Sequence, residues 1–163
     1  MWSGKTGAAI RAYLEQEALG VDVFCFQEAD KLFPAMADEI LGNRFNKLSA
    51  YKFVDDDDLF PQAIYVRNGI AIIESGTILN EVANVGLGLN CVLKKGDRRV
   101  TLGNIHGISK PGNKLDTEAR LRQSSEIINY YGDKDGSVII GGDFNLEKGT
   151  ESVGKFCRSG YRY

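Results

Sequence analysis

The chain has 163 residues, a length typical of one domain, and 43% of them are hydrophobic, which is enough for a sizeable core. With 26% charged residues and a net charge of −2, the composition excludes a disordered chain and a protein coated throughout with cations for nucleic acid. The charge is uneven, because the segment from Lys94 to Arg122 holds eight Lys or Arg and three Asp or Glu. This basic segment predicts either the attraction of an anion to one region or a set of solvated loop and helix side chains.

The cysteines and the apolar runs indicate the cellular environment. Cys25, Cys91 and Cys157 cannot all pair, and none has CxxC spacing, so we expect reduced thiols and no zinc site. No apolar run approaches the ~20 residues of a membrane span, and the first residues lack the apolar centre of a signal peptide. We therefore expect a soluble, cytoplasmic chain that is a monomer.

The N-terminal half is predicted to begin with a helix and a strand. Apolar residues on one helical face, with a stop at Gly20, predict a helix over Lys5–Leu19, and the run VDVFCFQ predicts a strand over Val21–Gln27. A proline suited to a first turn predicts a short helix over Pro34–Leu41. The four aspartates 55–58 lack the spacing and the glycine of a calcium loop, so we expect a solvated loop there. Three short strands are expected at Tyr51–Val54, Ala63–Val66 and Ile70–Glu74.

The C-terminal half is predicted to contain a hairpin, a helix, a strand and the start of another helix. The hairpin turns at Gly96–Asp97, between strands at Leu87–Leu93 and Arg99–His106. The later elements are a helix capped by Asp116 or Thr117, running to about Tyr131 with a stripe of Leu121, Ser124, Ile128 and Tyr131, a strand at Ser137–Ile140, and a helix from near Glu151. Strands interleaved with helices and a hairpin predict a single α/β or α+β domain over residues 1–163.

Polar side chains follow three of the predicted strands. Glu28 comes directly after an apolar run, where one carboxylate can anchor a hard cation such as Mg²⁺. His106, the one histidine, ends a second strand, where an imidazolium or an N–H group could bond a phosphoryl oxygen. Asp143 and Asn145 are two residues apart and point to the same side of an extended backbone. The pair Gly141–Gly142 before them removes side chains and would let a ligand approach closely.

Each of these groups also has a purely structural interpretation. A carboxylate after a strand often caps a turn, and an Asp-x-Asn pair often forms an Asx turn. A lone histidine at a strand end is commonly a satisfied structural group. Three such clusters at three strand ends are less easily explained by turns, so we interpret them together as one candidate site.

Three runs in this order and spacing resemble the endonuclease/exonuclease/phosphatase superfamily: Asp22–Glu28, Asn104–Gly107 and Ile140–Asn145. That superfamily includes deoxyribonuclease-I-like nucleases, abasic-site endonucleases, neutral sphingomyelinases and inositol polyphosphate 5-phosphatases. Phe26-Gln27-Glu28 resembles its first acidic motif, and Gly142-Asp143-Phe144-Asn145 resembles its most specific one. The resemblance implies a two-sheet β-sandwich flanked by helices, with an active cleft at one end that hydrolyses phosphate esters using Mg²⁺ or Mn²⁺.

The resemblance also implies a role for each candidate residue. Glu28 matches the metal-binding glutamate, and Asp143 matches the aspartate that orients or deprotonates the attacking water. Asn145 matches an asparagine that helps to hold the phosphate and that aspartate. His106 matches a position that donates a hydrogen bond to the phosphoryl group. The basic segment flanks His106 and could neutralise a polyanionic substrate.

The same resemblance implies parts that this sequence lacks. The superfamily has an asparagine-bearing strand before the tryptophan that Trp2 resembles, and a further aspartate and a Ser-Asp-His motif beyond the position of Tyr163. We therefore expect a sandwich incomplete at both termini, from a metal-dependent phosphodiesterase, that is itself an inactive or weakly active fragment. The expected substrate is a phosphate ester: nucleic acid, a phospholipid or a small phosphodiester. The alternatives are a non-catalytic phosphate- or nucleic-acid-binding module and a plain structural domain.

Overall fold

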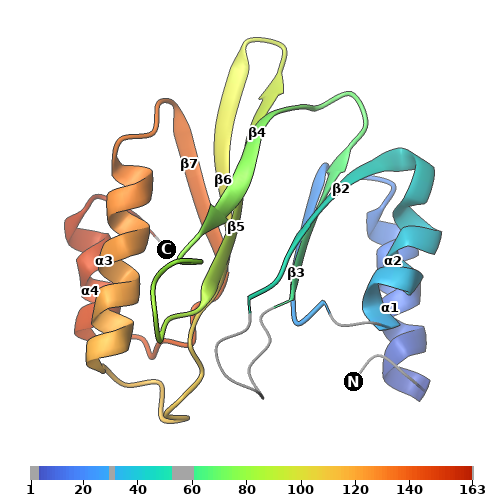
Figure 1. Cartoon of the computed structure of the whole chain (residues 1–163). Helices are drawn as coiled ribbons and strands as arrows, with labels where there is room; N and C mark the ends of the chain where they lie inside the picture. Colours follow the sequence, from blue (N-terminus) through green and yellow to red (C-terminus); the bar gives the residue numbers. More distant parts are fainter. Residues whose placement is uncertain (1–3, 30–31, 53–60, 163) are drawn as a thin grey trace.

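Figure 1 shows the fold as a computed structural model that describes residues 4–29, 32–52 and 61–162. The helices are α1 (Gly4–Glu17), α2 (Leu32–Leu41), α3 (Glu118–Gly132) and α4 (Glu151–Arg158), with a short 3₁₀ turn, η1, at Gly42–Arg44. The strands are β1 (Val23–Gln27), β2 (Phe45–Ala50), β3 (Gln62–Arg67), β4 (Ala71–Ile78), β5 (Leu87–Lys95), β6 (Arg98–His106) and β7 (Ser137–Asp143). Trp2, the aspartates 55–58, Tyr163 and part of the predicted strand Tyr51–Val54 lie outside the described residues.

The described strands form two sheets that face each other. One is three-stranded in the order β1-β3-β2, and the other is four-stranded in the order β4-β5-β6-β7. All neighbouring strands are antiparallel except β6 and β7, which are parallel. Helices α1 and α2 cover the outer side of the first sheet, and α3 and α4 cover the outer side of the second (Figure 1). The predicted helix-flanked β-sandwich of the α+β class is confirmed.

Apolar side chains fill the interface between the sheets. Ile64 and Val66 of β3 lie in one buried cluster with Leu89 and Cys91 of β5. Full burial of each large aliphatic side chain contributes roughly 1.5–3 kcal/mol to folding. Cys25 of β1 packs against this cluster, and burial raises the pKa of its thiol to about 12 and that of Cys91 to about 11. Both thiols are therefore unreactive at neutral pH.

Two buried side-chain amides also cross this apolar interface. Gln62 of β3 donates to the carbonyl oxygen of Leu87 at 2.7 Å and accepts from the Leu89 N–H at 3.3 Å, both on β5. Asn104 of β6 donates to the carbonyl oxygen of Phe26 on β1 at 3.0 Å and accepts from the side chain of Gln27. Because unsatisfied buried amides are costly, these bonds specify how the sheets are placed against each other.

Two details of the sheets and helices differ from the prediction. β2 has no counterpart among the predicted strands, because its sequence FNKLSA alternates weakly and Phe45 is its one buried residue. On α3 the predicted stripe is shifted, and the buried residues are Arg120, Gln123, Ser124, Ile127 and Tyr131. The reason is that Arg120 and Gln123 point inward to make hydrogen bonds with backbone groups. Of the two predicted caps, Thr117 is the one that caps α3.

β7 is one of the two edge strands of its sheet among the described strands, and β4 is the other. Its Ile139 side chain is 55% exposed. That side chain lines two neighbouring hollows of about 590 and 370 Å³, each with mostly apolar walls. None of the helices in the described part of the chain is long and apolar enough to cross a membrane.

The two glycines before Asp143 differ in how closely a neighbouring strand approaches them. Gly142 has a φ of +128°, and a Cβ there would lie 2.0 Å from the carbonyl oxygen of Ile105 on β6. A Cβ on Gly141 would meet no atom within 4 Å. Gly142 is therefore required for close contact between strands, while the expected role of the pair in the approach of a ligand stays a prediction.

Replacing these glycines by alanine should separate the two roles. Gly142→Ala combines a left-handed φ with a backbone clash, and the strain alone should lower the free energy of unfolding by roughly 1–3 kcal/mol. Gly141→Ala is the matched control and should stay within about 0.5 kcal/mol of the wild type. Urea unfolding followed by circular dichroism measures both, and equal stabilities of the two variants would contradict this assignment.

Candidate active site

The candidate site lies where three strands end together. β1 contacts β6 and β7 across the sandwich. In the parallel ladder of β6 and β7, His106 is paired with Asp143, so both strands end level with each other. Glu28 directly follows β1, whose last residues are held to β6 by the Asn104 bonds. The structure thus brings the three polar clusters predicted from the sequence to one end of the sandwich.

The two carboxylates of the site are open to solvent. Glu28 is exposed and has a φ of 51°, in the left-handed region that few residues other than glycine adopt. Asp143 is also exposed, and one of its oxygens accepts a hydrogen bond from the Asn145 N–H at 2.9 Å. The Asx turn considered as a structural alternative is therefore present, and it orients the Asp143 carboxylate.

Asn145, in contrast, is only 4% exposed, and its side chain is engaged by protein groups. Its Nδ2 donates to the carbonyl oxygen of Gly107 at 2.7 Å, and its Oδ1 accepts from Nζ of Lys114. A lysine can only donate and a carbonyl can only accept, so these partners determine the orientation of the amide. The contacts tie the turn after β7 to the segment after β6.

His106 is buried, with 7% of its surface exposed. Burial is the largest influence on its pKa and lowers it below the ordinary value of 6.5. The carboxylates of Asp143 and Glu28 act in the opposite direction, and Lys114 lowers the pKa further. All three charges thus lie within electrostatic reach of the imidazole, which is neutral at neutral pH. Of the two forms considered from the sequence, this favours an N–H donor over an imidazolium.

Two supporting residues of α3 were not singled out as site residues in the sequence. Arg120 is fully buried, and its guanidinium donates to the carbonyl oxygens of Leu115, Ser109 and Pro111. Gln123 accepts hydrogen bonds from the backbone N–H groups of Gly86 and Ile108, at 3.1 and 3.0 Å. The available signal was their spacing with Ile127 and Tyr131, which places polar residues on the buried face of the helix.

Lys114 is a third residue that reaches the site without having been singled out. It belongs to the basic segment between Lys94 and Arg122, and its ammonium meets the amide of Asn145. The excess of positive charge in that segment was visible in the sequence. The local folding that brings one of its lysines to Asn145 was not.

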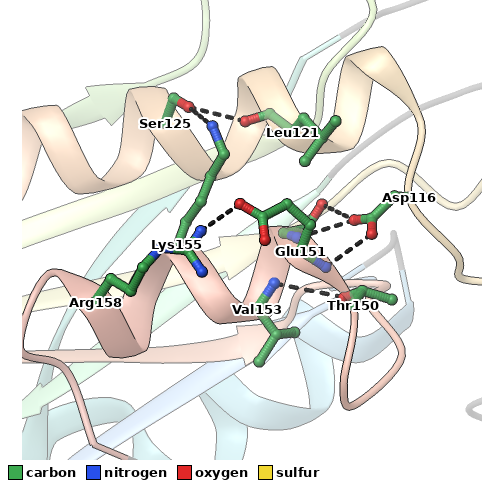
Figure 2. A network of polar contacts seen from close by, with 9 residues as sticks. Asp116, Leu121, Ser125, Thr150, Glu151, Val153, Lys155 and Arg158 are labelled. Atoms are coloured by element: carbon green, nitrogen blue, oxygen red, sulfur yellow. Dashed lines mark hydrogen bonds and ion pairs between the residues drawn. The ribbon is translucent and has the colours of Figure 1, made fainter.

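A second polar network joins the segment after β6 to α4 (Figure 2). Asp116 accepts hydrogen bonds from the N–H groups of Glu151 and Ser152, at 2.7 and 2.9 Å, and from the Ser152 hydroxyl. The hydroxyl bond is the main cause that lowers the pKa of Asp116. The carboxylate thus stabilises the N-terminus of α4, where the helix dipole favours negative charge.

The site supplies few protein ligands for a metal ion. Among the described residues, no group of three or more His, Cys, Asp or Glu side chains is arranged to hold one. Mg²⁺, however, is commonly bound through one or two carboxylates, with waters and substrate oxygens completing the shell. The exposed Glu28 carboxylate fits that single-anchor arrangement.

The lowered pKa of His106 predicts a pH dependence of stability. Below about pH 6.5 the unfolded chain binds a proton that the buried, folded imidazole resists, so stability should fall as the pH drops from about 7 to about 5. The carboxylates whose pKa is lowered in the folded chain, such as Asp116, stop contributing to folding stability only below about pH 4. Urea midpoints measured against pH should show this slope in the wild type and a flatter one in His106→Asn, and identical slopes would contradict it.

The sequence and structure were compared with known proteins. No model of a protein family and no curated protein matches the sequence. An endonuclease/exonuclease/phosphatase family protein from Bacteroides thetaiotaomicron has a TM-score of 0.73 and 18% identity, over 97% of this chain and 65% of that chain. D. rerio TDP2, humanized by 14 mutations, has a TM-score of 0.69 and 18% identity, over 96% and 62%. The human nocturnin catalytic domain with bound sulfate anion has a TM-score of 0.69 and 19% identity, over 90% and 61%.

These structures extend beyond the part that this chain matches. The chain spans about 62% of the length of the solved chains, while most of its own length is covered. At these identities the match concerns the fold. The chain has the helix-flanked, two-sheet fold of the endonuclease/exonuclease/phosphatase proteins.

Proposed function

We propose that this chain carries the catalytic end of a metal-dependent phosphoesterase that hydrolyses a phosphodiester with an activated water. The observation that carries the proposal is the convergence of Glu28, His106 and Asp143 at one end of the sandwich, where both carboxylates act on the imidazole. The shared fold with endonuclease/exonuclease/phosphatase proteins supports it. Phosphoryl transfer depends on positioning and charge stabilisation, which such a cluster can supply.

In this mechanism the exposed Asp143 carboxylate, oriented by the Asn145 N–H, accepts a proton from a water molecule. The water oxygen bonds to phosphorus as the bond from phosphorus to the ester oxygen breaks, and that oxygen leaves with the bonding electron pair and takes a proton from solvent water. The neutral imidazole of His106 donates a hydrogen bond to a phosphoryl oxygen. Asn145 contributes by holding Asp143 in place.

Mg²⁺ or Mn²⁺, when bound, supplies Lewis-acid neutralisation of the phosphate charge. Glu28 is the protein anchor that we propose for it. Water and substrate oxygens would complete the coordination shell of the ion, in keeping with the preference of Mg²⁺ for retained waters. The proposed substrate class is a phosphate ester: nucleic acid, a phospholipid or a small phosphodiester.

We also infer that this chain is catalytically weak by itself. The resemblance in sequence implies two histidines in different roles, and the chain has one. Groups that act as a unit lose most of their rate when one member is missing. The second candidate function is a non-catalytic phosphate- or nucleic-acid-binding module. The presence of one histidine, from which we infer weak catalysis, favours it together with the basic segment.

Metal binding distinguishes the two candidates. Glu28→Gln should weaken Mn²⁺ binding about tenfold or more, because it removes the proposed carboxylate anchor. Glu74→Gln, on the exposed part of β4, is a matched control and should bind as the wild type does. Calorimetric titration measures all three proteins. Equal Mn²⁺ affinity of Glu28→Gln and the wild type would count against the metal-dependent enzyme.

Hydrolysis of bis(p-nitrophenyl) phosphate tests the role of Asp143. If the carboxylate acts as the general base, Asp143→Asn should reduce the metal-dependent rate by a factor of about 10²–10⁴. Asp97→Asn, at the β5–β6 turn, removes the same charge at the opposite end of these strands and should leave the rate unchanged. Equal metal-dependent rates of Asp143→Asn and the wild-type chain would contradict the general-base role of this carboxylate.

A further inference from the structure

The two segments that follow β6 and β7 are joined along their length. The loop after β6 covers residues 107–117, and the loop after β7 covers residues 144–150. Hydrogen bonds connect these loops and the elements next to them at four places along their length. Near the strand ends, Gly107 N–H donates to Asp143 O at 2.7 Å and Asn145 Nδ2 donates to Gly107 O at 2.7 Å. Further along, Glu147 N–H donates to Lys114 O at 2.9 Å and Glu151 N–H donates to Asp116 at 2.7 Å. The loops therefore form one platform beside the candidate site.

The guanidinium of Arg120 organises the first loop from inside. It is fully buried and donates to backbone carbonyl oxygens of that loop, at 2.6 Å to Leu115 and 3.1 Å to Ser109. A buried cation that lost these acceptors would carry a desolvation penalty of several kcal/mol. The loop conformation and the burial of Arg120 thus depend on each other, which gives the platform rigidity.

Lys114 is the cation that this platform presents to the site. Its φ of 60° turns the backbone locally while its carbonyl oxygen is bound by the Glu147 N–H. Its ammonium donates to the amide oxygen of Asn145, a neutral group that does not itself cancel the positive charge of the lysine. The charge is close enough to His106 to lower the pKa of the imidazole.

The contacts of Asn145 show which group has donors left for an anion. One of the two N–H donors of Asn145 is taken by the carbonyl oxygen of Gly107, and burial of the residue limits the access of an external anion to the other. The ammonium of Lys114 is half-buried and has three N–H donors, of which the Asn145 oxygen takes one. Charge-assisted hydrogen bonds to phosphate are also stronger than those from a neutral amide.

We propose that Lys114 is the residue that binds the phosphoryl oxygens, and that Asn145 acts as a positioning residue that aims it. The inference rests on the proposed function, because it deepens the same site. It moves the phosphate contact expected of Asn145 to a lysine of the basic segment. His106 and Lys114 then supply a neutral and a charged donor to one phosphate group.

Binding of inorganic phosphate to the full chain, followed by nuclear magnetic resonance titration, tests the proposal. Lys114→Gln should weaken phosphate binding about tenfold, the loss of one charge-assisted hydrogen bond, whereas Lys114→Arg should retain most of it. Lys94→Gln is the matched control: it removes the same charge from the same basic segment at the far end of β5, and should change the affinity by less than about twofold.

A double-mutant comparison tests the positioning role of Asn145. If Asn145 acts through Lys114, Asn145→Ala should weaken phosphate binding in the wild type and add little in the Lys114→Gln background. Thermal unfolding of each variant shows whether the fold is retained. If Asn145→Ala unfolds, the phosphate affinity of Lys114→Arg is the measurement used in its place. Equal additive losses in the two backgrounds would overturn the positioning role.

The outcomes for Lys114 and for the proposed function are distinguishable. Wild-type affinity in Lys114→Gln, or no measurable phosphate binding by the wild type, overturns the assignment of Lys114. Weaker phosphate binding in Lys114→Gln, together with no effect of Glu28→Gln on Mn²⁺ and no hydrolysis, supports Lys114 while the enzyme fails. Such a result would describe an anion-binding module built on this fold.

Discussion

The arrangement of the candidate site depends on the pair of amide bridges between the two sheets. Apolar contacts alone allow sheets to slide, because dispersion and burial are not directional. Gln62 and Asn104 are both almost fully buried; backbone groups of the opposite sheet satisfy Gln62, and the Phe26 carbonyl oxygen and the Gln27 side chain satisfy Asn104. Sliding by one residue would leave both amides without partners inside the sandwich, at a cost of about 1–3 kcal/mol for each unsatisfied group.

These bridges have a direct effect on the chemistry. Asn104 is two residues before His106, and its partner Phe26 is two residues before Glu28. The bond between Asn104 and Phe26 fixes the ends of β6 and β1 against each other. It thus holds the Glu28 carboxylate and the His106 imidazole at a set separation across the sandwich. The ladder of β6 and β7 adds Asp143 on the other side of His106. Groups placed on strand ends in this way are held more rigidly than groups on free loops.

Much of this arrangement could be predicted from local sequence, and the remainder depends on tertiary contacts. The apolar run before Glu28 and the turn at Gly96–Asp97 are short-range signals, and the corresponding strands and hairpin are confirmed. β2 is polar and lies at the edge of its sheet, so its pairing with β3 supplies what its own sequence lacks. The spacing of Arg120 with Ile127 and Tyr131 places it on the buried face of α3, but its partners could not be read from the sequence, because they are carbonyl groups of a loop that forms only in the folded chain.

The same division applies to the candidate site. The four polar residues were found because each lies at the end of a predicted strand or just after it, where a polar residue can reach solvent. The part of Lys114 could not be found in this way, since a lysine in a loop has no local signature, and only the contact with Asn145 distinguishes it from its neighbours. Gly142 could be noted as a glycine, but the reason for it, the carbonyl oxygen of Ile105, belongs to another strand.

The position of β7 at an edge of its sheet, among the described strands, has a consequence for how the chain behaves at high concentration. From Ser137 to Gly142 this strand has no charged side chain. The exposed Ile139 side chain lines both apolar hollows. A strand with open backbone groups and no charge is a template on which extended polypeptide can aggregate, and charged residues on such strands normally prevent this. A lysine at position 139 would therefore keep concentrated preparations of the chain dispersed without touching the end of the sandwich where the polar groups meet.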